Sequence, residues 1–210
     1  GLIYVTFVAM NYPSVLIEEA VNERSKFPGV GKKSAMRMVL HLLKQQETDV
    51  VKLGKAIIKL RTEIKYCTRC GNVSDTDTCN ICNNTKRNQH TICVVEDLRD
   101  VIAIENTAQF TGTYHILGGL ISPVNGVGPD DLNIQKLIER IKAEETTEVI
   151  MALSATMEGD TTVFYLSRKL REFNINISTI SRGIAIGGEL EYADEITLGR
   201  SIALRVPYQG

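Results

Sequence analysis

The segment CTRCGNVSDTDTCNIC (residues 67–82) decides how this sequence is organised. It has the spacing C-x2-C-x8-C-x2-C, with cysteines at Cys67, Cys70, Cys79 and Cys82. Each Cys-x-x-Cys pair places two thiolates on one tight turn, and two such turns can close a tetrahedron around Zn²⁺. Four sulfur ligands leave no open coordination position. The spacing therefore predicts a structural zinc site and not a catalytic one.

The composition supports metal ligation over disulfide bonding. The 210 residues are 43% hydrophobic and 23% charged with a net charge of −1, which excludes disordered, collagen-like and coiled-coil classes. No apolar run approaches the roughly 18 residues of a membrane span, and the first ten residues lack the basic start of a signal peptide. We therefore expect a cytoplasmic protein with no membrane partner, in which paired cysteines bind metal. The fifth cysteine, Cys93, lies in an apolar run and is expected in a core strand.

Charge is distributed unevenly along the chain. Residues 1–66 contain 11 Lys/Arg and 6 Asp/Glu, a balance of +5, whereas residues 91–210 contain 10 and 17, a balance of −7. A basic first part can bind a polyanion, and an acidic second part can bind other partners. The alternative is that these charges only solvate the surface.

The basic part contains FPGVGKK (residues 27–33). We expect helices on both sides of it, the first capped by Ser14 and the second running from Ser34 to Leu43. Two glycines allow a tight turn that exposes backbone N–H groups at the start of the second helix, a favourable place for a phosphate. The residues expected to bind DNA there are Gly29, Gly31, Lys32, Lys33 and Arg37. A plain helix–helix turn is the alternative.

Further helical periodicity gives predictions about burial in this part. In the second helix, Ala35, Met38, Val39, Leu42 and Leu43 are spaced to share one face. A third helix is expected over residues 50–66, with Leu53, Ile57, Leu60 and Ile64 facing inward.

After the zinc segment, strands alternate with helices. We expect strands over residues 91–96, 114–117, 148–153 and 177–180. Helices are expected over residues 97–106, from Asp130 or Asp131 to Ile141, and from the segment TMEGD (residues 156–160) to Phe173. Connections of this length predict right-handed βαβ units and a mainly parallel sheet with strands buried on both faces.

Four acids lie at the carboxyl ends of two of these strands: Glu96 and Asp97 end the first strand, and Glu158 and Asp160 follow the third. Open α/β sheets bind ligands at the carboxyl ends of their strands, where such acids could share a Mg²⁺ ion. Alternatively, Asp97 and Asp160 only cap the helices that follow. The spacing favours neither interpretation.

The order of motifs resembles one bacterial family. FPGVGKKSAMRMVLHLL, the four-cysteine segment, ICVVED, HILGG and MEGD together resemble the RecR family of recombination mediators from residue 12 to the end. Residues 1–9 match no part of the family pattern and Met10 resembles the natural start, so we expect the upstream stretch to be an extension, native or non-native.

The resemblance implies a fold and a domain order. The fold expected is a multi-domain α+β chain: a helix-hairpin-helix bundle (1–66), a four-cysteine zinc motif (67–88), a Toprim-type α/β domain (89–181) and a C-terminal assembly segment (182–210). The last segment contains RGIAIGGEL (residues 182–190), which resembles the family's C-terminal motif. No phosphate-binding GxxxxGK[ST] loop is present, so nucleotide hydrolysis is not inferred.

The resemblance also implies a function. RecR-like proteins bind single- and double-stranded DNA without sequence preference, form rings that are commonly tetramers, and work near the nucleoid with RecO and RecF to load RecA during gap repair. Glu96 corresponds to the Toprim glutamate, and Glu158-x-Asp160 to the D-x-D of Toprim enzymes. Because the first Asp is Glu and no nucleophilic tyrosine motif is near, we expect a non-enzyme whose acids bind partner proteins. One alternative is a Mg²⁺-dependent nuclease or primase, and another is a zinc-stabilised interaction protein with no role on DNA.

Overall fold

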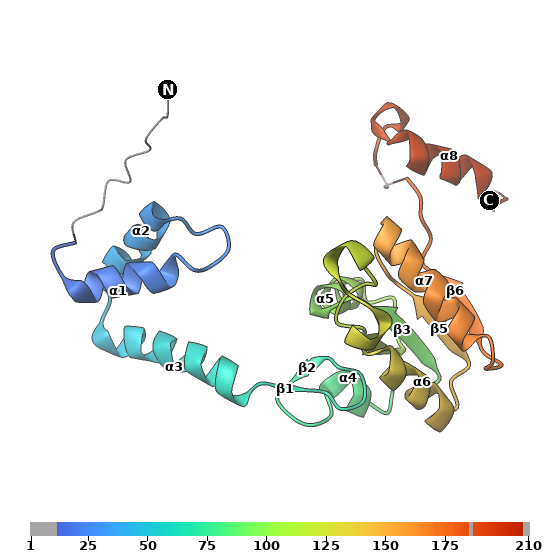
Figure 1. The fold of residues 1–210 in the computed structure, drawn as a ribbon, viewed down its shortest axis with the longest axis horizontal. Coiled ribbons are helices and arrows are strands. Elements are labelled where there is room, and N and C mark those ends of the chain that lie inside the picture. Colours follow the sequence, from blue (N-terminus) through green and yellow to red (C-terminus); the bar gives the residue numbers. More distant parts are fainter. Residues whose placement is uncertain (1–11, 185–186, 208–210) are drawn as a thin grey trace. The chain divides into compact units, whose positions relative to one another are not determined.

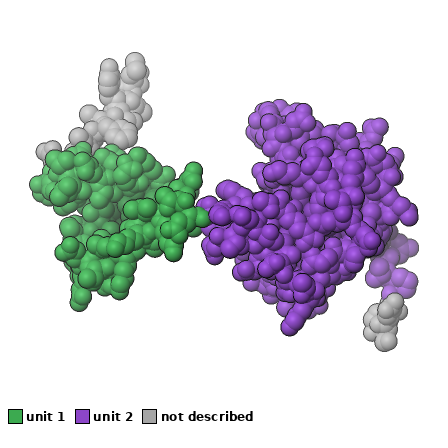
Figure 2. Space-filling model, turned by 90° about the horizontal axis from the view of Figure 1, so that it is seen from below, with its two compact units in different colours: residues 1–63 green, residues 64–210 purple. Residues whose placement is uncertain are grey.

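The computed structural model describes residues 12–184 and 187–207, and the chain divides into two compact units between Glu63 and Ile64 (Figures 1 and 2). The expected extension, residues 1–9, lies outside the described residues, as does part of the motif at residues 182–190. None of the described helices combines the length and the apolar character needed to cross a membrane.

The first unit consists of helices. Its elements are α1 (Val15–Arg24), α2 (Lys32–Leu42) and α3 (Glu47–Glu63). The Ser14 hydroxyl accepts a hydrogen bond from the N–H of Leu16 at 3.2 Å, which confirms the expected N-cap of α1. Val21, Ala35 and Val39 form a small core between α1 and α2.

Helix α2 differs from its prediction in two ways. It begins at Lys32 and not at Ser34, because the extended backbone of Gly31 forms the N-cap. Ala35 and Val39 are buried as expected, but Met38 and Leu43 are 40% and 65% exposed. The core of this unit is smaller than the apolar face of the helix, so only the centre of that face is covered.

The prediction that α3 turns an apolar face inward is wrong within this chain. Leu53, Ile57 and Leu60 are 40%, 49% and 64% exposed, and no residue of α3 is buried. The helix also runs three residues earlier than expected, over Glu47–Glu63. Helical periodicity identifies an apolar face, but it does not say what covers that face.

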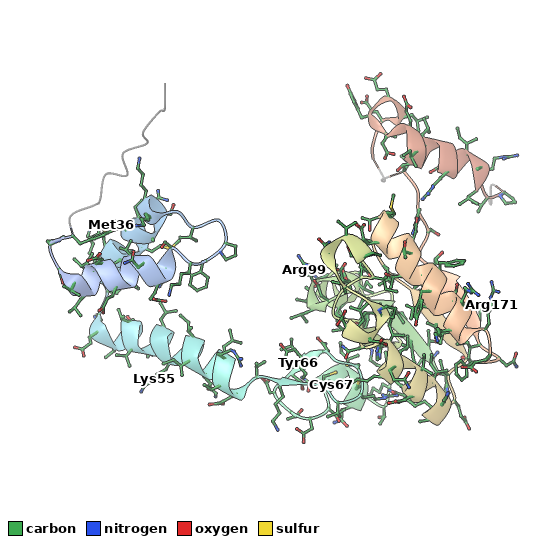
Figure 3. All side chains as sticks on the ribbon, viewed as in Figure 1. Met36, Lys55, Tyr66, Cys67, Arg99 and Arg171 are labelled. Atoms are coloured by element: carbon green, nitrogen blue, oxygen red, sulfur yellow. The ribbon has the colours of Figure 1, made fainter. Side chains whose placement is uncertain are left out.

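The second unit begins with a small module around the four cysteines. It contains the antiparallel pair β1 (Lys65–Tyr66) and β2 (Val73–Ser74), followed by the short helix α4 (Asn80–Asn83). Figure 3 labels Tyr66 and Cys67 where β1 ends and the first cysteine turn begins. The four cysteines form its buried cluster, and Ile81 packs against them.

A four-stranded parallel sheet forms the centre of the second unit and confirms the predicted sheet class. Its spatial order is β4-β3-β5-β6, with strands β3 (Thr91–Val95), β4 (Thr113–Ile116), β5 (Glu148–Met151) and β6 (Asn176–Thr179). In register, Val94 of β3 lies opposite His115 of β4 and Met151 of β5. Strands β3 and β4 are fully buried, but β6 is an edge strand with exposed ends, so the expectation of burial on both faces fails there.

Helices cover both faces of this sheet (Figure 1). The flanking helices are α5 (Leu98–Asn106), α6 (Ile134–Ala143) and α7 (Met157–Leu170). Ile92 and Val94 pack with residues of α6 and α7, while Cys93 and Val95 pack toward α5 on the opposite face. Cys93 is thus the buried strand residue that the sequence predicts, and burial raises the pKa of its thiol to about 12.

The start of α6 differs from the expectation that Asp130 or Asp131 caps it. Both aspartates lie in a short 3₁₀ helix, Pro129–Asp131, and Asn133 occupies the N-cap position of α6. Another 3₁₀ helix spans Pro123–Asn125, and after β6 the chain forms the 3₁₀ helix Leu190–Tyr192 and helix α8 (Glu195–Ala203).

Candidate zinc centre, nucleic-acid interface and acidic sheet edge

The four predicted zinc ligands meet in one buried cluster. Their sulfur atoms all lie within 4.8 Å of one another, and each cysteine is at most 7% exposed. The sulfurs of Cys70 and Cys79 are 3.6 Å apart, too far for a disulfide bond. The distance is close to the edge of about 3.8 Å expected for a tetrahedron with Zn–S bonds of about 2.3 Å. The donor set and its spacing therefore fit a zinc ion.

Backbone N–H groups surround these sulfurs. The amides of Asn72, Cys79 and Cys82 donate to the sulfurs of Cys70, Cys67 and Cys79 at 3.5, 3.3 and 3.5 Å. Such hydrogen bonds stabilise the thiolate form that binds metal. Gly71 directly follows Cys70, where the chain turns with a φ of +77°. A Cβ at this position would lie 3.2 Å from the carbonyl oxygen of Ile116. This position requires glycine for both its conformation and its close contact.

The zinc module is bonded directly to the edge of the parallel sheet. The N–H of Ile116, at the end of β4, donates to the carbonyl of Cys70 at 2.8 Å. Arg69, between the first two cysteines, forms two hydrogen bonds to the carboxylate of Glu144, at 2.7 and 2.8 Å, and one to the carbonyl of Cys82 at 3.2 Å. One arginine thus joins both cysteine turns to the residue that ends α6.

Glu144 is shared with a second arginine. Arg140 donates to Glu144 at 3.0 Å, to the carbonyl of Tyr114 at 2.7 Å and to the hydroxyl of Thr113 at 2.7 Å, and its side chain is only 4% exposed. Burial disfavours the charged form of Glu144, but hydrogen bonds and charge from Arg69 and Arg140 outweigh it and lower its pKa. Sequence reasoning missed this cluster, because the partners lie up to 75 residues apart.

We expect Glu144→Gln to lower the free energy of unfolding by about 1–2 kcal/mol at pH 7, because two arginines lose their shared carboxylate. Because the pKa of Glu144 is lower in the folded state, its ionised carboxylate stabilises the fold above the unfolded-state pKa of about 4.3. This stabilisation is lost as the pH falls through the folded-state pKa. The difference from wild type should therefore shrink below about pH 4. Urea unfolding across pH measures it.

The matched control is Glu145→Gln, which removes the same charge from the exposed neighbouring residue. Equal stability of the two variants at pH 7 would contradict a role for the Arg69–Glu144–Arg140 cluster.

The basic hairpin lies between α1 and α2, where the sequence places it. Gly29 has a φ of +77°, and the N–H of Val30 donates to the carbonyl of Phe27 at 3.0 Å, which closes the turn. Gly31 is extended and makes no side-chain cap, so the first amides of α2 face outward without an internal acceptor.

The electrostatics of this helix start favour an anion. Lys32 and Lys33 occupy its first two positions, Arg37 follows one turn later, and all three side chains are exposed. The first turn of α2 has no acidic residue, and in the described part of the chain none of these three cations forms an ion pair. The positive end of the helix dipole adds to their charge.

The predicted acids lie at the carboxyl ends of β3 and β5. Asp97 caps α5: its side chain accepts from the N–H of Arg99 at 2.7 Å and pairs with the Arg99 guanidinium, which lowers its pKa. Glu96 is half-buried, and burial together with the charges of Asp100 and Asp97 raises its pKa.

The second pair of acids lies in the first turn of α7. Thr156, and not Asp160, caps this helix through a 3.1 Å hydrogen bond from the N–H of Gly159. Asp160 instead pairs with Arg182 at 2.5 Å. Among the described residues, the four cysteines form the only group of three or more His, Cys, Asp or Glu whose ligand atoms lie within 4.8 Å of one another. The four acids therefore share one end of the sheet without converging on a point.

Comparison with known families matches each part of the chain in turn. Residues 17–60 match the helix-hairpin-helix of RecR, residues 64–84 the four-cysteine zinc finger domain of RecR, residues 90–181 the Toprim domain, and residues 183–206 the C-terminal part of RecR. The order of these matches follows the elements described above.

Curated relatives match along nearly the whole chain. Proteins named Recombination protein RecR from Flavobacterium johnsoniae and Phocaeicola vulgatus are each 58% identical, and the one from Bacteroides thetaiotaomicron is 57% identical. Each alignment covers 95% of this chain and 97% of the relative.

Proposed function

The chain belongs to the RecR family of recombination proteins, and on this premise we propose that it is a DNA-binding mediator of recombinational repair. The observation that carries the proposal is the exposed basic start of α2, where outward amides adjoin Lys32, Lys33 and Arg37. Backbone amides and cations of this kind bind phosphate oxygens, which every DNA sequence presents alike. The test is affinity for single- and double-stranded DNA across a salt titration.

Self-association would give such a hairpin enough affinity. One hairpin offers few phosphate contacts, whereas several hairpins held together bind with a raised effective concentration. The exposed apolar side chains of α3 support this part of the proposal, because a face with Leu53, Ile57 and Leu60 at 40%, 49% and 64% exposure is costly to leave in water. We propose a homo-oligomer, with a ring tetramer as the expected form.

We propose that the protein acts as a scaffold and not as a nuclease or primase. Mg²⁺-dependent phosphodiester chemistry needs acids that converge on the ion, and Asp97 and Asp160 are each paired with an arginine instead. In this proposal the zinc module has a structural role, and the protein works in the bacterial cytoplasm near the nucleoid, with RecO- and RecF-type partners, to load the recombinase at single-stranded gaps.

The acidic sheet edge is the proposed docking site for a basic partner, through Glu96, Asp97, Glu158 and Asp160. We expect Glu158→Lys to weaken binding of a RecO-type partner by about tenfold or more, because it places a like charge against a basic surface. Affinity measured by calorimetry at two salt concentrations checks this.

Glu172→Lys is the matched control, because it makes the same charge change at an exposed residue just beyond the other end of α7. A partner that binds the Glu158 variant as tightly as this control would exclude the sheet edge as its docking site.

A further inference from the structure

Two of the four acids at the sheet edge already hold a cation from their own chain. Asp97 pairs with Arg99, two residues further along at the start of α5. Asp160 pairs with Arg182, which follows β6 and begins the C-terminal segment, of which the structure describes residues 182–184 and 187–207. The second pair is the more informative one, because it joins segments 22 residues apart.

The arrangement of these acids does not fit a divalent ion. Mg²⁺ requires oxygen ligands in near-octahedral geometry at about 2.0–2.1 Å. In the described residues no three carboxylates come within 4.8 Å of one another, and one oxygen of Asp160 is in contact with the Arg182 guanidinium. Glu158, two residues earlier, has no ion-pair partner in the described part of the chain.

The packing around Asp160 places the guanidinium of Arg182 beside its carboxylate. Parallel strands end at one edge of the sheet, so the start of α7 after β5 and the segment after β6 lie at the same end (Figure 1). A cavity of about 660 Å³ there is lined by Asp160, Arg182 and Arg200, among other residues. The hydrogen bond from Arg182 lowers the pKa of Asp160, and the charge of Arg200, from α8, acts in the same direction.

A guanidinium has advantages over a hydrated metal ion at such a site. It is always charged, and it is weakly hydrated, so it loses little hydration free energy when it leaves water. Because the guanidinium is tethered to the same chain, it competes with free cations for Asp160 at an effective concentration in the millimolar range or above. The Arg182 side chain is 28% exposed and that of Asp160 is 46% exposed, so the pair is partly shielded from solvent.

We propose that Arg182 is the resident cation of the acidic sheet edge. Its guanidinium neutralises the charge of Asp160, and the same contact holds the start of the C-terminal segment against α7. This inference does not depend on DNA binding or on partner docking, and it connects the charge state of the sheet edge to the position of the C-terminal segment.

The first test measures Mn²⁺, a paramagnetic substitute for Mg²⁺, by electron paramagnetic resonance on the full chain. Since no three carboxylates converge, Mn²⁺ should bind this edge only weakly in any variant. We expect Arg182→Gln nevertheless to bind it about tenfold more tightly than wild type, because the cation that repelled the ion from Asp160 is gone. Adding Asp160→Asn to this variant should abolish the gain. Arg171→Gln, which removes an exposed arginine just after α7 (labelled in Figure 3), should behave as wild type.

The second test measures hydrogen exchange of the amides in residues 187–207. Arg182→Gln and Asp160→Asn should each speed exchange in α8 about two- to fivefold, the range for loss of a partly exposed ion pair, and the Arg171 variant should not. Unchanged exchange in the buried strand β3 shows that the variants are folded. Equal Mn²⁺ affinity of wild type and Arg182→Gln, or unchanged exchange in α8, would overturn the proposal.

Discussion

Replacing both Lys32 and Arg37 by alanine is expected to weaken DNA binding on the order of 100-fold, about tenfold for each lost charge-assisted contact to phosphate. The loss should be equal for unrelated sequences, because phosphate contacts carry no sequence information. The slope of log K against log salt should fall by about one for each cation lost per hairpin. Fluorescence anisotropy with single- and double-stranded oligonucleotides across a salt titration measures both quantities.

The physical reason is the position of these side chains at the start of α2. Lys32 is the first residue of the helix and Arg37 lies beyond its first turn, on an exposed surface beside amides that have no internal acceptor. Removing the cations leaves the amides and the dipole, so weak binding should persist at low salt. Because affinity also depends on how many hairpins act together, light scattering must show the same mass for variant and wild type.

A matched control separates this site from general positive charge. Lys44→Ala with Lys55→Ala removes two exposed cations from the same unit, at the far end of α2 and on α3, where Figure 3 labels Lys55. We expect it to lower affinity far less. If both double variants lose the same affinity, binding is due to diffuse charge, and the hairpin is only a turn.

Replacing Cys70 by serine is expected to have the largest effect on stability. Zinc content should fall from about one ion per chain to nearly none, because three thiolates bind Zn²⁺ far more weakly than four. We expect the melting temperature to fall by about 10 °C or more, as several kcal/mol of metal binding no longer stabilise the fold. Metal analysis by mass spectrometry and calorimetric melting measure the two effects.

The effect should extend beyond the zinc module. The carbonyl of Cys70 accepts the N–H of Ile116 at the end of β4, and Arg69 connects the module to Glu144. Hydrogen exchange should therefore increase at the β4 edge of the sheet as well as in residues 65–84. An increase confined to the module would mean that the sheet is stable without it.

Cys93→Ala is the control, since it removes a buried thiol that lies outside the cluster, in β3. It should keep one zinc per chain and lose only the stability expected for a small core deletion, about 1 kcal/mol. A Cys70 variant that keeps its zinc, or a Cys93 variant that loses it, would contradict the assignment of the four ligands.

Local sequence patterns predicted much of this molecule. Ser14 caps α1, the glycines at 29 and 31 form the hairpin before α2, and the four cysteines meet as their spacing requires. The alternation of short apolar runs with helices predicted the parallel sheet, and Cys93 lies in its core. In each case the information lies within a few residues, where covalent geometry and hydrogen bonding leave few alternatives.

The helix boundaries and faces were less predictable. Neither Asp131 nor Asp160 caps a helix as expected, because a 3₁₀ turn precedes α6 and Thr156 already satisfies the first amides of α7. The apolar face of α3 was correctly recognised as apolar but is exposed within the described chain. A periodic pattern reports which side of a helix avoids water, whereas its burial depends on a partner that the pattern does not identify.

The sequence by itself thus determined the order of parts, the clustering of the four cysteines and the basic hairpin, because these features depend on residues close together in the chain. Only the tertiary structure decided which charges meet: Arg69 with Glu144, and Arg182 with Asp160. Those pairs form only after segments distant in the chain pack against one another. No local spacing encodes that meeting, because it depends on how the elements pack together in three dimensions.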